Sequence, residues 1–246
     1  MSVCERSPLS QALKLDDAIG EAQDTLAVLS WRYKWDWDGA ERELNRAIVL
    51  APSYSCARED HWEYLSFVGR QAEAQAELSK SSELDPGPTF AITESGVYYH
   101  LRDFKALVEA SRRGVVTNPN EWVEHYFLGV GYEGTGKRLE AISEDQRAVE
   151  LSGGDQDAAA ALAHFAAIDR RAEAEKILRD LLQKAKSVYV SPSVIATIYA
   201  GLGENDKAFE YLGKSIEREM SNISWSLKAD LGMDNLRSDP RVESLR

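Results

Sequence analysis

The stretch WVEHYFLGVGYEGTGKRLEAISEDQRAVEL, residues 122–151, contains two helical patterns joined by a glycine turn. In each half, large apolar residues recur three or four positions apart, and Gly129, Ala141 and Ala148 stand among them. This spacing places the apolar side chains on one face of each helix, and the small residues allow two helices to approach closely. The stretch therefore predicts a helix–turn–helix unit with its turn at Gly136.

Within this stretch, GYEGTGKR (131–138) has the glycine spacing of a phosphate-binding loop. Such a loop follows a buried strand and carries Ser or Thr after its lysine as a magnesium ligand. Here a helical pattern precedes the glycines, and Arg138 follows Lys137. Gly69 and Gly203 occupy the same place in other parts of the chain without a lysine after them. We therefore interpret the glycines as packing and turn residues.

The helical pattern recurs along the chain. The segments ELNRAIVLAP, ELSKSSELDP and ASRRGVVTNP end at Pro52, Pro86 and Pro119, which are 34 and then 33 positions apart. A fourth segment, EDQRAVELSG, places Gly153 a further 34 positions along. Proline and glycine at these places end a helix. A period of this length indicates a repeat protein built from helix pairs.

The repeat resembles the tetratricopeptide repeat, a helix–turn–helix of about 34 residues. HWEYLSFVGRQAEAQAELSKSSELDP (61–86) fits it through Gly69 and Ala74, and ATIYAGLGENDKAFEYLGKSIE (196–217) fits it through Gly203 and Ala208. The resemblance implies an all-α, right-handed superhelical solenoid in which each pair contacts its neighbours.

We expect a single domain over residues 1–246. About six repeats occupy residues 18–219, residues 1–17 form a partial repeat, and residues 220–246 form a C-terminal cap. The first repeat, LAVLSWRYKWDWDGAERELNRA (26–47), has one residue more than the repeat pattern requires. Two other repeats, which contain YYHLRDFKAL and HFAAIDRRAEA, have one residue fewer in the turn between their helices. We expect the turns between helices to absorb these differences. In YVSPSVI, Pro192 predicts the start of a helix.

Three stretches carry a narrower resemblance. KWDWDGAERELNRAI (34–48), YVSPSVIATIYAGLG (189–203) and LRSDPRVESLR (236–246) are similar to the repeat tails of bacterial multidomain signalling proteins, although Val242 stands where those tails usually have Phe. In such proteins the tail follows a winged-helix, Ser/Thr kinase or cyclase domain. This resemblance implies an alternative function as the regulatory or sensor module of a larger signalling or transcription-regulatory protein.

Charge and composition exclude several function classes. The net charge of -12 has the wrong sign for nucleic acid, whose binding depends on cations that replace phosphate counterions, and an acidic surface is repelled by anionic membranes. The start of the chain lacks the apolar run of a signal peptide, and no run is long enough to span a bilayer. Two cysteines, Cys4 and Cys56, do not form a disulfide framework. We expect a cytoplasmic protein.

No motif predicts catalysis, a cofactor or a metal. DWDGAERE (36–43) resembles part of a calcium loop, but Lys34 and Asn45 stand where that loop needs acids, so we interpret Asp38 as a helix cap. The four histidines occur in different repeats with no i, i+4 pair. No nucleophile signature of a hydrolase is present. An enzyme remains an alternative that thermal-shift measurements with ATP, GTP, Mg²⁺, Ca²⁺ or Zn²⁺ would test.

In the family that the repeats resemble, the first helix of each pair lines a concave groove. Mapped onto this chain, the ligand-facing positions are Glu59, Glu63, Phe67, Thr93, Val97, His100, Tyr126, Val130, Glu133 and His164. Members that clamp a C-terminal carboxylate use cations at these positions, whereas this chain has acids and apolar residues. The resemblance implies a non-catalytic scaffold whose protein partner has apolar anchors and basic flanks. Alternatively, these side chains pack between repeats or are solvated. The oligomeric state is open.

Overall fold

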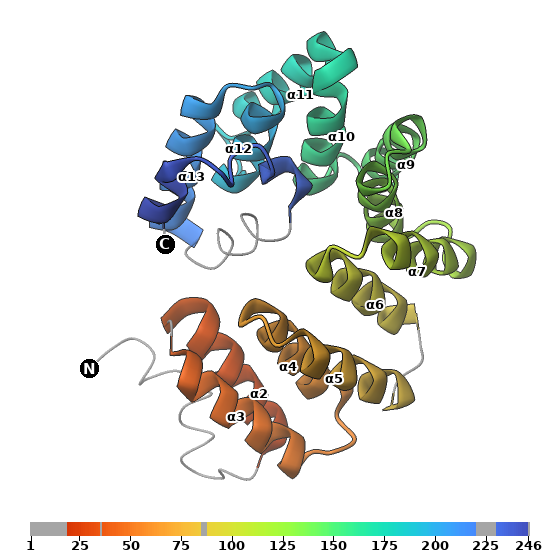
Figure 1. Ribbon diagram of the computed structural model, residues 1–246, viewed down its shortest axis with the longest axis vertical. Coiled ribbons are helices and arrows are strands. Elements are labelled where there is room, and N and C mark those ends of the chain that lie inside the picture. The colour runs from red at the N-terminus through yellow and green to blue at the C-terminus, as the bar shows by residue number, and fades with distance from the viewer. Residues whose placement is uncertain (1–18, 35, 85–87, 220–229, 246) are drawn as a thin grey trace. The chain divides into compact units, whose positions relative to one another are not determined.

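The computed structural model describes residues 19–34, 36–84, 88–219 and 230–245. These residues form helices joined by short turns, and the described ranges contain no β-strand, so the expected all-α class is confirmed (Figure 1). The chain divides into two compact units, Met1–Thr93 (unit 1) and Glu94–Arg246 (unit 2). The single domain expected over residues 1–246 stays a prediction.

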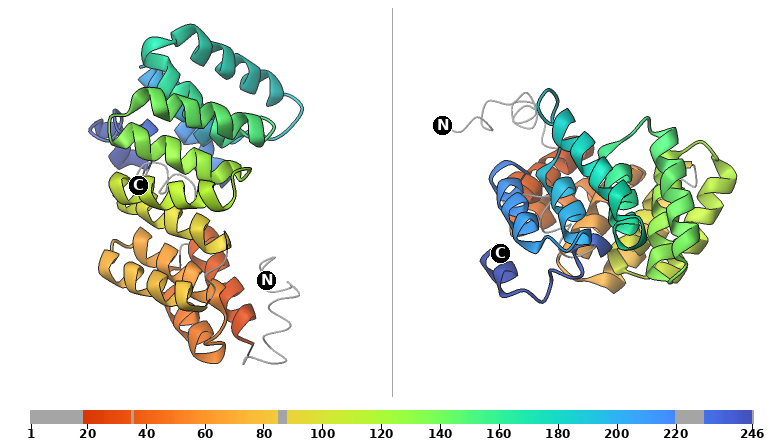
Figure 2. Two further views of the ribbon diagram at one scale, coloured as in Figure 1. Left: turned by 90° about the vertical axis from the view of Figure 1, so that its right-hand side faces the viewer. Right: turned by 90° about the horizontal axis from the view of Figure 1, so that it is seen from above.

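The helices follow one another as first and second members of antiparallel pairs, which Figure 2 shows from two further sides. The first helices are α2 (Gly20–Leu29), α4 (Ser55–Phe67), α6 (Pro88–Leu101), α8 (Trp122–Gly134), α10 (Gln156–Asp169) and α12 (Pro192–Gly201). The second helices are α3 (Trp37–Leu50), α5 (Gln71–Leu84), α7 (Phe104–Thr117), α9 (Arg138–Leu151), α11 (Arg171–Lys184) and α13 (Asn205–Glu219). Pro192 begins α12, as its sequence predicts.

The turn within several pairs has one geometry. Gly69, Gly136 and Gly203 have positive φ angles of 82°, 76° and 75°, which glycine adopts without a steric cost. The amide one residue further along then bonds back across the turn, as in Lys137 N to Tyr132 O at 2.8 Å, and this bond satisfies a carbonyl at the helix end. The prediction that Gly136 is a turn residue is confirmed, and α8 is the helix that precedes it.

Small residues lie where the helices touch. Seven alanines of the second helices are completely buried: Ala40, Ala47, Ala74, Ala141, Ala148, Ala174 and Ala208. On α8, a Cβ added to Gly129 would overlap the Asp145 carboxylate, and one added to Gly131 would lie 2.8 Å from Val108 Cγ2. The close packing predicted from Gly129, Ala141 and Ala148 is therefore present.

The first pair differs from the expectation in two ways. Its extra residue is absorbed by a π-helical turn, Ser30–Lys34 (η2), which continues α2, and not by the turn between the helices. A π-turn accommodates an inserted residue inside a helix by widening one turn. The cap of α3 is also Asp36 and not Asp38, because the Asp36 carboxylate accepts a bond of 2.8 Å from Gly39 N. Trp35 lies outside the described residues.

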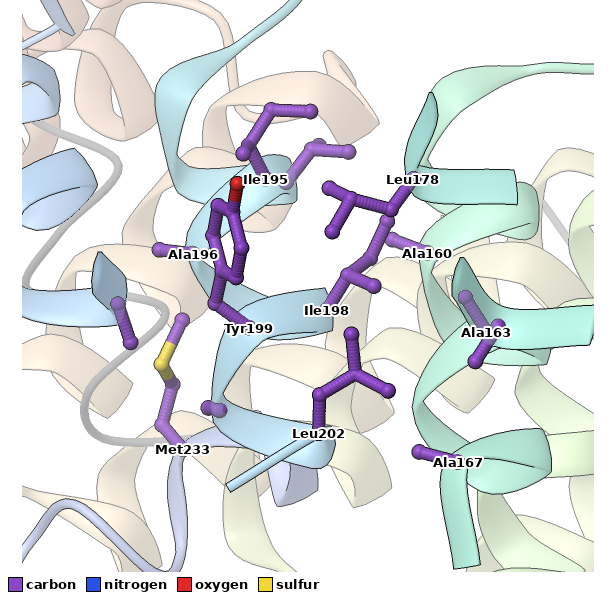
Figure 3. Close-up of a cluster of buried hydrophobic side chains, with 14 of the residues drawn as sticks. Ala160, Ala163, Ala167, Leu178, Ile195, Ala196, Ile198, Tyr199, Leu202 and Met233 are labelled. Atoms are coloured by element: carbon purple, nitrogen blue, oxygen red, sulfur yellow. The ribbon is translucent and has the colours of Figure 1, made fainter. Parts of the chain in front are cut away.

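One hydrophobic cluster of unit 2, the core cluster, is built from α10 to α13 and from residues beyond them (Figure 3). Ile198 and Leu212 are fully buried there beside the small side chains of Ala160 and Ala163. Met233 enters the same cluster from a 3-10 turn, Leu231–Met233 (η3), which is followed by a second one, Pro240–Leu245 (η4).

Residues 230–245, which we call the C-terminal segment, hold two further fully or nearly fully buried side chains, Leu236 and Val242. This part of the chain contributes apolar side chains to the core cluster, and the C-terminal cap expected over residues 220–246 stays a prediction. Residues 220–229 of the predicted cap lie outside the described residues, as do residues 1–18.

Candidate functional site

The first helices of unit 1 carry a group of carboxylates. Asp24 lies on α2, and Glu59, Asp60 and Glu63 lie on α4. Arg32 of η2 contributes one cation, and its guanidinium forms an ion pair with Glu63. We call these five residues the acidic cluster.

Asp24 and Asp60 form a hydrogen-bonded carboxyl pair. Asp24 is 3% exposed, and burial together with the neighbouring Asp60 raises the pKa of Asp24 to about 8. Burial likewise raises the pKa of Asp60. Two carboxylates cannot share a hydrogen bond unless one of them is protonated, so the pair holds a proton near neutral pH. Oδ1 of Asp24 is buried and has no hydrogen-bond partner among the described residues.

Glu63 and Phe67 lie one turn further along α4. Glu63 is 9% exposed, and its burial raises the pKa of the carboxyl although Arg32 acts in the opposite direction. Phe67 is partly exposed, with its ring centroid 5.0 Å from that of Trp31, and the Arg32 guanidinium lies 4.8 Å from the Trp31 ring. An apolar aromatic surface therefore borders the carboxylates.

Glu77 of α5 has two basic partners, one of them on α4. Glu77 on α5 accepts from Arg58 at 2.7 Å and from Lys80 at 2.8 Å. Glu77 is therefore neutralised by two cations of unit 1. In the acidic cluster, Glu59 accepts from Ser81 Oγ at 3.3 Å, a neutral donor.

The first helices of unit 2 carry a different set of predicted ligand-facing side chains, Tyr126 and His164. Tyr126 of α8 is partly exposed; burial raises the pKa of its phenol, and the carboxylates of Asp230 and Asp157 act in the same direction. His164 of α10 lies beside Gly232, since a Cβ on that glycine would be 3.4 Å from His164 Nδ1. These two residues, predicted to face a ligand, therefore face the C-terminal segment.

Polar bonds fix the C-terminal segment to this face. The Asp230 carboxylate accepts from Thr197 Oγ1 at 3.1 Å and from Gly232 N at 2.8 Å. Arg102, in the turn between α6 and α7, donates to Asp234 Oδ2 at 2.6 Å. Asn235 Nδ2 donates to the carbonyl of Ala200 at 2.8 Å. The segment therefore contacts groups from three helix pairs of unit 2.

The other residues predicted to face a ligand differ in how exposed their side chains are. Val97 and Val130 are 0% and 4% exposed, so their side chains pack between helices and are not available at a surface. Glu133 and His100 are partly exposed, and the His100 ring lies edge-on to Tyr99. The side chain of Thr93 lies outside the described part of the chain.

Sequence reasoning missed several residues of these surfaces. Asp24 could have been found by extending the groove positions to the first repeat, where it occupies the first helix. Arg102 and Asp234 are 132 positions apart, and nothing in the local pattern joins them.

Two further carboxyls are buried between helices of unit 2. Glu124 is 1% exposed and accepts from Ser95 Oγ at 3.0 Å; burial raises its pKa to about 7. Asp145 is completely buried, and burial raises its pKa well above the usual range. Both are enclosed by packed helices, so we do not assign them to ligand binding.

Within the described ranges, no group of three or more His, Cys, Asp or Glu side chains is arranged to hold a metal ion. No helix among the described residues is both long and apolar enough to cross a membrane.

Comparison with solved structures identifies the fold. The chain is similar to MamA from Desulfovibrio magneticus RS-1, with 17% identity and a TM-score of 0.54 over 69% of this chain and 97% of that one. It is similar to PilW, a type IV pilus biogenesis factor, with 16% identity and a TM-score of 0.61 over 77% and 87% of the two chains. It is also similar to human IFIT1, solved as a dimer with m7Gppp-AAAA, with 16% identity and a TM-score of 0.68 over 97% and 58%.

These structures contain tetratricopeptide repeats, so the fold implied by the sequence resemblance is confirmed. No protein-family profile matches the chain, and no curated protein matches it in sequence.

Proposed function

We propose that this chain is a non-catalytic scaffold that binds a peptide or protein segment on the first-helix face of unit 1. The acidic cluster carries the proposal, because Glu59 and Asp60 are partly exposed acids on one helix, α4, together with the partly exposed Phe67. A basic side chain on a partner would reach the cluster through these exposed acids.

The partner that fits has basic and apolar side chains together. Lys or Arg would be attracted to Glu59 and Asp60, which are partly exposed, while an apolar anchor would cover Phe67. A preformed helical surface loses little conformational entropy when it binds such a segment. Of the groove positions suggested by the sequence, this proposal uses Glu59, Glu63 and Phe67. We also propose that the protein is cytoplasmic.

A selection experiment tests the proposal without knowledge of the natural partner. A random 12-residue peptide display library is selected on the full chain, and the bound peptides are sequenced. We expect enrichment of Lys and Arg beside aromatic or aliphatic residues, with binding that weakens as salt rises because the contacts are between exposed charges.

The matched variants remove the same number of charges at two places. Glu59→Gln with Asp60→Asn should weaken the selected peptides at least tenfold. The control, Glu43→Gln with Glu83→Gln, neutralises acids of the second helices α3 and α5 and should leave binding unchanged. Selected peptides without basic residues, or equal loss in both variants, would contradict the proposal.

The alternative, a regulatory module of a larger signalling protein, rests on the three stretches that resemble such tails. One of them, residues 236–246, contributes Leu236 and Val242 to the core of unit 2. Reading the gene upstream of Met1 tests this alternative, since a DNA-binding, kinase or cyclase domain in frame would support it and a stop codon would contradict it.

A further inference from the structure

The carboxyl pair of unit 1 joins a buried acid to an acid that a partner can reach. Asp24 of α2 is 3% exposed, whereas Asp60 of α4 is partly exposed, and the two side chains are hydrogen-bonded to each other. Ionised carboxylates only accept hydrogen bonds, so this bond exists only while the pair holds a proton. A charge that approaches Asp60 from outside therefore acts on a proton that Asp24 shares.

The groups that face the pair oppose the loss of this proton. Burial and Asp60 raise the pKa of Asp24 to about 8, and the Glu59 carboxylate acts in the same direction. Burial also raises the pKa of Asp60, while Arg32 of η2 acts in the opposite direction. The Arg32 guanidinium is already paired with Glu63. The acidic cluster therefore holds four carboxyl groups and one cation, which a second carboxylate engages.

Tyr54, at the start of α4, is the uncharged neighbour of the pair. Burial raises the pKa of its phenol, and its hydrogen bond with Cys56 and the charges of Asp24 and Asp60 act in the same direction. The phenol therefore stays neutral while the pair ionises. Tyr54 adds no cation that could replace the proton.

A Lys or Arg side chain that reaches Asp60 competes with the shared proton. An opposite charge within a few ångströms lowers the pKa of a carboxyl, because it stabilises the ionised form. Binding and proton release are then linked, and the linkage is reciprocal: a cation that lowers the pKa of the pair binds more tightly once the proton has left.

We propose that a Lys or Arg side chain of the partner replaces the shared proton at the Asp24 and Asp60 pair, so that binding of a basic segment releases a proton and tightens as the pH rises. This inference rests on the proposed function, because it concerns the same acidic cluster, and it adds what the partner's cation displaces. The cluster should also prefer Lys and Arg to His, since a histidine loses its own charge as the pair gains one.

Isothermal titration calorimetry of the full chain with the peptide acetyl-KKFKK-amide tests the inference. Its lysines keep their charge between pH 6.5 and pH 9, and its ends are blocked. We expect the Kd to be at least threefold lower at pH 9 than at pH 6.5. At pH 7.5 the apparent enthalpy should vary with the ionisation enthalpy of the buffer in the direction of proton release.

Asp24→Asn is the matched variant, because its amide can donate to the Asp60 carboxylate without a shared proton. Its Kd should change by less than twofold between the two pH values. Other groups, including Cys56 and Glu124, are the same in both chains, so their ionisation cancels in the comparison. The peptide acetyl-HHFHH-amide should not bind the unmodified chain more tightly at pH 9.

NMR of the unmodified chain supplies a second measurement that needs no folded variant. The carboxyl carbon of Asp24 should titrate near pH 8 in the free chain. With saturating lysine peptide its midpoint should fall by about half a pH unit or more, which corresponds to the threefold change in affinity. An unchanged midpoint would overturn the inference.

The outcomes separate this inference from the proposed function. Binding of the lysine peptide that is independent of pH, or that tightens equally in Asp24→Asn, would overturn the inference and leave the scaffold function intact. Absence of binding at every pH, or full binding to Glu59→Gln with Asp60→Asn, would contradict the proposed function and the inference with it.

Discussion

The two units place different chemistry on equivalent helices. In unit 1, the first helices carry carboxylates, and the pair of Asp24 and Asp60 satisfies itself by holding a proton. In unit 2, the first helices contact a segment of the same chain, whose acids bind Arg102 and Thr197. The comparison shows that a repeat sets the position of a surface, while the side chains from elsewhere decide whether that surface is charged, neutralised or covered.

The difference has energetic consequences. Burial raises the pKa of a carboxyl because the folded protein disfavours the charged form. Unit 1 therefore loses stability as the pH rises and its carboxyls ionise, although the ionised carboxylates are the form that attracts a basic partner. In unit 2, Asp230 receives two hydrogen bonds, which oppose the effect of its burial. Stability and ligand affinity are therefore expected to conflict in unit 1.

The largest expected effect comes from a substitution that destabilises unit 2 and leaves the stability of unit 1 unchanged. Gly129→Leu would place a large side chain against the Asp145 carboxylate, and we expect a loss of about 3 kcal/mol or more in the stability of unit 2. Hydrogen exchange resolved by residue measures it, with faster exchange in unit 2 and unchanged exchange in unit 1.

Gly213→Ala on α13 is the matched control for that substitution. A Cβ at Gly213 meets nothing within 4 Å, so alanine should be neutral or stabilising by up to about 1 kcal/mol. Retention of a native melting transition in Gly129→Leu would contradict the close-packing argument.

The second prediction concerns the carboxyl pair of unit 1. The pKa of Asp24 is about 8 in the folded protein, against an ordinary value of 3.8 for an aspartate in water, so the folded state holds the extra proton between these values. Its stabilising contribution is complete below pH 4 and is lost as pH rises to about 8. Asp24→Asn cannot ionise, and we expect it to stabilise unit 1 by about 2 kcal/mol at pH 8.5.

Urea denaturation at pH 5 and pH 8.5 measures this effect. The substitution should stabilise the protein less at pH 5 than at pH 8.5, because at pH 5 only a small part of the stability linked to this carboxyl has been lost. An equal effect of Asp24→Asn at both pH values would show that packing and not ionisation is responsible.

The third prediction places a smaller pH effect in unit 2. Glu124 has a pKa of about 7 in the folded protein, against an ordinary value of 4.5 for a glutamate. Its contribution to the stability of unit 2 is therefore complete below pH 4.5 and is lost as pH rises to about 7. Glu124→Gln should remove this part of the slope and stabilise unit 2 by about 1 kcal/mol at pH 8. Hydrogen exchange at two pH values should show the change in unit 2 alone; a change in unit 1 would contradict it.

The smallest expected effect is at the glycine turn of unit 2. Lys137 is exposed, with Nζ 5.5 Å from the centre of the Tyr132 ring, a contact that contributes about 0.5 kcal/mol. Lys137→Ala should lower the melting temperature by at most a few degrees and leave partner binding unchanged. A melting temperature raised by ATP with Mg²⁺ in the unmodified chain, and lost in this variant, would restore the nucleotide hypothesis.

Much of the fold was predictable because it depends on local spacing. The turn at Gly136, the start of α12 at Pro192 and the buried alanines follow from patterns within about 34 residues. The π-turn at Ser30–Lys34 was not predicted, since an extra residue can be accommodated in a helix or in a turn and the packing of neighbouring side chains decides between them.

The candidate site was less predictable. Glu59, Glu63 and Phe67 were named from the sequence and lie on one helix, α4. Val97 and Val130 were also named, but first-helix positions can face either a groove or the next helix, and these two face neighbouring helices. The periodicity of one helix does not distinguish the two environments.

By itself, the sequence determined the all-α class, the helix pairs and the turns between them, because each depends on residues close together in the chain. Only the tertiary structure decided that Asp24 and Asp60 share a hydrogen bond and that Arg102 meets Asp234 across 132 positions. The physical reason is that protonation and ion pairing depend on burial and on distances between side chains. Those quantities exist only after the helices have packed.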